Sequence, residues 1–117
     1  MKLPPVKILN EHKNIVSFET LDRSFSGTAY KDVGCNESQY DIVSVELVDT
    51  STPLIESIPN KTATLNVIGP VTSIWEDGVF VIEVSDFDFW VSPEEYDGLV
   101  KQGQYFRLLV SNFTLYL

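Results

Sequence analysis

The side chains with the clearest chemical potential in this chain are carboxylates grouped around a tryptophan. The group consists of seven acids and one aromatic residue: Glu76, Asp77, Glu83, Asp86, Asp88, Trp90, Glu94 and Asp97. Acids at this density can serve three purposes. A pair of carboxylates can act as acid and base across a glycosidic bond, and several carboxylates can bind a hard cation. Negative charges around an aromatic anchor can also bind a basic protein.

Enzymatic chemistry is not indicated. General acid–base and nucleophilic catalysis ordinarily use His, Lys or Cys within a constellation. The single histidine, His12, falls in a polar segment expected to turn, and the single cysteine, Cys35, falls in a polar loop with no basic residue between Asp32 and Asn60. No phosphate-binding loop, dinucleotide fingerprint or nucleophile elbow occurs. We therefore expect no enzyme activity and no cofactor.

A metal or sugar site could use the same acids. Asp86 and Asp88 could each supply a carboxylate, with Glu94 and Glu95 near them in sequence. However, the calcium-loop pattern is missing, and a strand presents only alternate residues on one face. We expect no metal site, and keep a weak carbohydrate- or cation-binding domain that uses Trp90 and the acids as one alternative.

Charge is distributed unevenly along the chain. Residues 32–100 contain fourteen acids and one base, whereas residues 1–31 contain three acids and five bases, and residues 101–117 contain two bases and no acid. The whole chain carries −9. A folded domain with such a negative middle repels nucleic acid and acidic lipid and attracts basic proteins. We therefore expect neither nucleic-acid nor membrane partners.

The elements that position the acids are expected to be strands. Residues 86–91 alternate with period two, which places Phe87, Phe89 and Val91 in the core and Asp86, Asp88 and Trp90 on the opposite face. That tryptophan either serves as a binding anchor or packs under the segment that follows.

A hairpin is expected around Asp77-Gly78. This pair favours a two-residue type I′ turn, which would place Trp75 opposite Phe80. Opposed residues share a face, so Trp75 is expected in the core with Phe80, Ile82 and Val84.

A short helix is expected to start at Ser92. Ser92 can cap the free amides, Pro93 suits the first helical position, and Glu95 completes a capping box. Gly103 should end the helix after two or three turns. The residues expected on its buried side are Tyr96, Leu99 and Val100.

Alternating apolar residues and turn signals predict further strands along the chain. Their ranges are 6–9, 15–19, 24–30, 40–49, 62–68, 71–75, 104–110 and 112–117. Residues 40–49 are apolar on both sides and are therefore expected to be central. Gly69-Pro70 interrupts a β run and predicts a bend or corner.

These patterns together predict one mainly β domain over residues 1–117, with one short late helix, folded as a small barrel or sandwich. In the last third, the order of strand, short helix, glycine and strand is similar to connections in small OB-like or SH3-like barrels. The single Cys35 excludes an internal disulfide framework. No apolar run is long enough for a signal peptide or a membrane span, so we expect a cytoplasmic protein.

The leading functional hypothesis is a non-enzymatic acidic binding protein. In its concrete form it is an inhibitor or immunity-type protein that neutralises a basic protein partner, such as a toxin nuclease, through the eight residues of the group around Trp90. A second hypothesis is an assembly or accessory β-module that homo-oligomerises, in which case the acid serves only solubility.

Overall fold

The computed structural model describes residues 5–32, 39–48 and 64–116, and these form eight strands and no helix. The strands are β1 (Val6–His12), β2 (Ile15–Thr20), β3 (Ser26–Asp32), β4 (Gln39–Leu47), β5 (Thr64–Ile74), β6 (Phe80–Val84), β7 (Phe87–Val91) and β8 (Tyr105–Tyr116). Over these ranges, no helix has the length and apolar character needed to cross a membrane. Cys35 lies outside the described residues.

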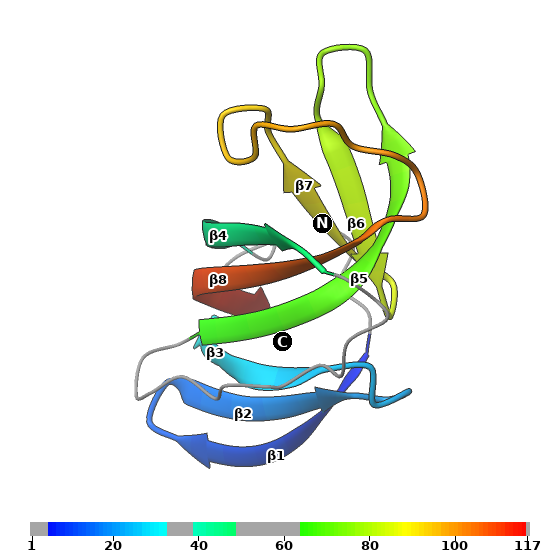
Figure 1. Ribbon diagram of the computed structural model, residues 1–117. Helices are drawn as coiled ribbons and strands as arrows, with labels where there is room; N and C mark the ends of the chain where they lie inside the picture. Colours follow the sequence, from blue (N-terminus) through cyan, green and yellow to red (C-terminus); the bar gives the residue numbers. More distant parts are fainter. Residues whose placement is uncertain (1–4, 33–38, 49–63, 117) are drawn as a thin grey trace.

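The strands form one sheet in the order β1-β2-β3-β8-β5-β6-β7, with β4 paired to β8. The β3–β8 pair is parallel and the remaining pairs are antiparallel. Figure 1 shows β1–β3 at one end of the molecule and β6–β7 at the other, joined by the long strands β5 and β8. The mainly β class is confirmed, but the sheet does not close into a barrel.

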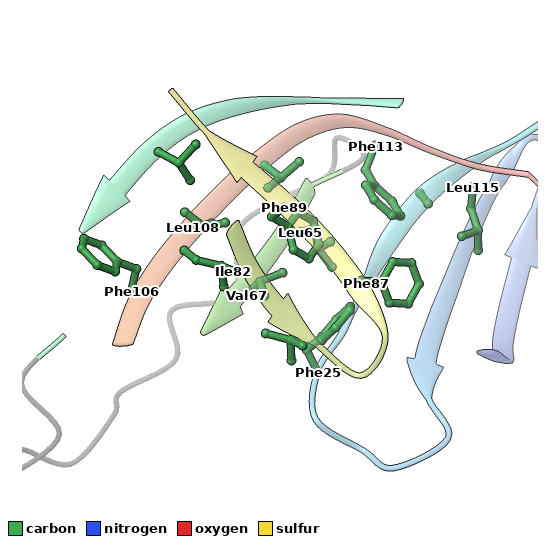
Figure 2. Packing of buried hydrophobic residues seen from close by; sticks show 14 of the residues in the cluster. Phe25, Leu65, Val67, Ile82, Phe87, Phe89, Phe106, Leu108, Phe113 and Leu115 are labelled. Carbon is green, nitrogen blue, oxygen red and sulfur yellow. The ribbon is translucent and has the colours of Figure 1, made fainter. Parts of the chain in front are cut away.

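The core lies on the inner face of this sheet, which folds back so that β7 faces β8. Phe87 on β7 contacts Phe113 on β8 with ring centroids 6.2 Å apart, and it contacts Phe25 at 5.3 Å (Figure 2). Phe87, Phe89 and Val91 are fully buried, which confirms the predicted alternation of residues 86–91. Fully burying one such side chain contributes about 1.5–3 kcal/mol, so this packing joins the two ends of the sheet.

The Gly-Pro pair marks the point where β5 changes its neighbour. Residues from Thr64 to Pro70 pair with β8, and residues from Val71 to Ile74 pair with β6. Gly69 lies at the crossing, where a Cβ would overlap the Val84 side chain. The glycine therefore allows β6 to cross close to β5, and the strand continues through the predicted corner.

The β5–β6 hairpin differs by one residue from the predicted register. Ile74, not Trp75, pairs with Phe80, and Trp75 N–H donates to the Val79 carbonyl. Only Gly78 in this loop has positive φ (91°), whereas a type I′ turn needs two such residues. The loop is therefore three residues long, a type I turn followed by a glycine bulge. The prediction that Trp75 is buried in the core was wrong.

The predicted helix after Ser92 is absent from the described residues, which contain a single turn there. Only half of the expected capping box forms. Glu95 Oε1 accepts from Ser92 N–H (3.1 Å), but Ser92 Oγ donates to the same oxygen (3.0 Å), and Glu95 N–H donates to the Ser92 carbonyl instead of the hydroxyl. The Tyr96 ring packs edge-on against Phe106 at 4.9 Å and against Phe80 at 6.1 Å. After Tyr96 the chain leaves the helical path, and Leu99 is 89% exposed instead of buried.

Two other strand predictions need correction. β4 pairs only with β8 among the described strands and leaves Val43 exposed, so it is not central. A register shift between Ile42 and Ser44 changes which residues face inward. The two predicted C-terminal strands are one strand, β8, in which Asn112 has a φ of 52° and shifts the buried alternation by one residue.

Candidate functional site

The outer face of β6 and β7 brings together a tryptophan and two carboxylates. Val81 lies opposite Trp90, and Glu83 lies opposite Asp88. The neighbouring residues on each strand point inward to the core, so period two places these four on the opposite face. Glu83 and Trp90 are exposed there, Asp88 is half-buried, and Val81 is buried. Asp88 and Trp90 are therefore on the outer face, as the sequence predicts.

Trp75 joins this face from the end of β5. Its ring centroid is 4.8 Å from that of Trp90, and the ring planes meet at 65°. Trp75 is 44% exposed and Trp90 is 53% exposed, although Trp residues are usually well buried. We call Trp75, Trp90, Glu83 and Asp88 the tryptophan face. Sequence reasoning missed Trp75 because its burial was inferred from the wrong hairpin register.

Tyr40 on β4 holds the backbone of Trp90 in place. Its hydroxyl oxygen accepts from Trp90 N–H at 3.0 Å, and its ring packs against Phe89 at 5.4 Å. Burial raises the pKa of the Tyr40 phenol; the Trp90 N–H opposes this shift, and the charges of Glu95 and Asp88 add to it. The phenol therefore stays neutral, and its hydrogen bond holds the Trp90 backbone in position.

Glu83 and Asp88 form a pair of like charges. Side chains directly opposite each other on antiparallel strands have Cβ atoms about 5 Å apart, and like charges placed so are unfavourable. Within the described residues neither carboxylate forms an ion pair. The face therefore presents negative charge that is not balanced locally.

Asp86 lies beyond this pair, in the turn between β6 and β7. Ser85 and Asp86 have φ values of 53° and 68°, and Val84 pairs with Phe87. Positive φ at both central residues is the geometry of a type I′ turn. The turn type expected at Asp77-Gly78 thus occurs here, without a glycine.

The remaining acids of the predicted group lie at the opposite end of the β6–β7 hairpin. Glu76 and Asp77 are in the β5–β6 loop, and Glu94 and Asp97 are exposed in the segment after β7. The two segments touch, because a Cβ on Gly78 would be 2.8 Å from the Pro93 ring. The eight predicted residues are therefore spread along the hairpin: Asp86 lies at the β6–β7 turn, Glu83, Asp88 and Trp90 lie on the strands, and the other four lie at the opposite end.

Asp22 connects the β2–β3 loop to the turn that carries Asp86. Its Oδ1 accepts from Ser85 Oγ at 2.8 Å, from Ser24 N–H at 2.9 Å and from Thr20 Oγ1 at 2.9 Å. Hydrogen bonds from Ser24, and then from Ser85 and Thr20, hold the pKa of Asp22 well below its usual range. The ionised form of Asp22 is thus the one that joins the two loops.

We expect Asp22→Asn to lower the melting temperature at neutral pH. Because the pKa of Asp22 is lower in the folded state than in the unfolded state, its charge stabilises the fold above about pH 4. This contribution is lost as pH falls below that value toward the folded pKa. The difference in melting temperature between wild type and variant should therefore shrink as the pH is lowered from 4. Asp97→Asn, which removes an exposed charge, is the control, and an equal pH response in both variants would contradict the prediction.

Among the described residues, no three His, Cys, Asp or Glu side chains gather in a way that could hold a metal ion. Comparison of the chain with protein-family models, curated proteins and solved structures gave no match in any of the three.

Proposed function

We propose that this protein is a non-enzymatic binding protein that neutralises a basic protein partner, as an inhibitor or immunity protein neutralises a toxin domain such as a nuclease. The observation that carries the proposal is the tryptophan face, where two contacting, half-exposed indoles lie beside two opposed carboxylates. Tryptophan is enriched among the residues that contribute most to binding energy at protein interfaces.

The charge around this face favours a basic partner. Residues 64–100 contain eight acids and no Lys, Arg or His. At the other end of the sheet, Lys31 pairs with Glu11 at 2.9 Å and Arg23 lies 3.7 Å from Glu19. The acids are therefore concentrated in residues 76–97, which include the β6–β7 hairpin at the other end of the molecule from β1–β3 (Figure 1). Their negative field raises the rate of encounter with a basic protein and disfavours phosphate-bearing partners.

The test is capture of a basic partner by the immobilised full chain at low and high ionic strength. We expect a stoichiometric partner that binds at ~0.02 M salt and is released at ~0.5 M, because screening weakens exposed charge pairs. A Glu83→Gln, Asp88→Asn double variant should capture less of it, while Glu11→Gln, at the other end of the sheet, should not. Capture that is insensitive both to salt and to the double variant would contradict the proposal.

A homo-oligomerising module is the second candidate. Its basis is β1, which is an outer strand among the strands that the structure describes and which exposes Ile8 and Leu9. An unpaired strand edge can pair with a second copy. Sedimentation of the free protein separates the candidates, since a stable oligomer favours the module and a monomer favours the binding protein.

A further inference from the structure

We infer that the tryptophan face recognises an arginine side chain of the partner. This inference rests on the proposed function and specifies the chemistry of its site. The face combines a carboxylate with an indole, since Asp88 and Trp90 lie two residues apart on one strand and point to the same side. Such neighbours are separated by about 6.6 Å along the strand, which is within the reach of a single bound side chain.

The indole pair supplies an exposed aromatic surface for a cation. The 65° angle between the rings sets the edge of one indole against the face of the other, so the rings do not cover each other fully. Both rings remain about half exposed. A cation positioned over a tryptophan face within about 6 Å is attracted by the ring quadrupole. The neighbouring carboxylates strengthen the attraction for a cation and oppose the approach of an anion.

Guanidinium fits this arrangement better than ammonium. A guanidinium group is planar, so it can stack on an indole and at the same time donate hydrogen bonds from its edge to a carboxylate. An ammonium group is a compact, strongly hydrated charge that lacks such a plane. Glu83 and Asp88 lie on the same face as the indoles. One arginine side chain can therefore stack on an indole and donate hydrogen bonds to a carboxylate at the same time.

The acids at the other end of the hairpin provide a comparison within the same molecule. Glu94 and Asp97 are exposed like Glu83, whereas Asp88 is half-buried, and the aromatic residue of their segment, Tyr96, packs inward against Phe80 and Phe106. We therefore expect these acids to attract Arg and Lys equally, whereas the tryptophan face prefers Arg.

The experiment titrates the ¹⁵N-labelled full chain with an arginine oligopeptide and a lysine oligopeptide of equal length. The chain contains two tryptophans, so two indole N–H signals report directly on the face. We expect the arginine peptide to shift both signals and to bind about three- to tenfold more tightly than the lysine peptide. Trp90→Leu should abolish this preference, and Trp75→Leu should reduce it. The second variant tests the inference even if the first fails to fold.

Charge variants separate this inference from the proposed function. Glu83→Gln with Asp88→Asn should weaken both peptides and remove the preference, whereas Glu94→Gln with Asp97→Asn should leave the preference intact. Equal affinity for the two peptides, or a preference that survives both tryptophan variants, would overturn the arginine inference. If binding nevertheless weakened on removal of the acids, the proposed function would stand. Failure of both peptides to bind at low salt would overturn both.

Discussion

Replacing Gly69 with alanine is expected to lower the free energy of unfolding by roughly 1–3 kcal/mol, the usual cost of overpacking a filled core. The new Cβ would overlap Val84 Cγ2 and would lie 3.3 Å from Ile82 Cγ2. Both side chains belong to the core, and β5 is held on its other side where Gly69 pairs with Phe106. Neither strand can move away without losing pairing or packing.

Denaturant unfolding of a double-mutant cycle measures this effect. Val84→Ala removes the methyl group that the new Cβ would meet, so the double variant should lose less stability than the sum of the two single changes. Gly27→Ala would overlap buried Leu65 away from β6, so it measures the cost of overpacking elsewhere in the core. Additive costs in the Gly69–Val84 cycle would show that the approach of β6 to β5 is not the cause.

The second large effect is expected for Asp86→Lys combined with Asp88→Lys. Reversing both charges should slow association with a basic partner on the order of 10–100-fold at low salt, because encounter is steered by the local field. The lysine introduced at position 88 would lie opposite Glu83, so an unfavourable like-charge pair becomes a favourable one. A lysine at position 86 would occupy a φ of 68°, which favours Asp, Asn or Gly, so this substitution costs some stability. Circular dichroism of the variant establishes that it is folded before its rate is compared.

Association rates measured over a range of salt concentrations test this expectation. The matched control is Glu94→Lys with Asp97→Lys, which makes the same change of charge at the other end of the hairpin. We expect that control to slow association less, and the two variants to converge as salt rises. An unchanged rate for Asp86→Lys with Asp88→Lys would rule out this placement of the binding surface.

Part of the candidate site could be predicted from the sequence, namely Asp88 and Trp90, whereas Trp75 could not. Strict alternation in residues 86–91 places Asp88 and Trp90 on one face, because a half-buried strand can satisfy that pattern in only one way. Trp75 could not be placed because its position depends on the length of the Glu76–Gly78 loop. The loop is one residue longer than expected, so Phe80 pairs with Ile74 instead of Trp75. A shift of one residue in a strand's register moves each side chain to the opposite face. An Asp-Gly pair is compatible with either loop.

What the sequence determined by itself was local: the β class, the buried alternation of β7, the contact of Glu95 with Ser92 N–H and the concentration of acid in residues 64–100. Each depends on neighbouring residues and on the period of a strand. The tertiary structure alone decided three further features. Tyr96 packs between Phe80 and Phe106, and only one turn forms where a helix was expected. Gly69 allows β6 to cross β5, and Trp75 meets Trp90. These depend on contacts between segments far apart in the chain, and local propensity does not determine which of those contacts form.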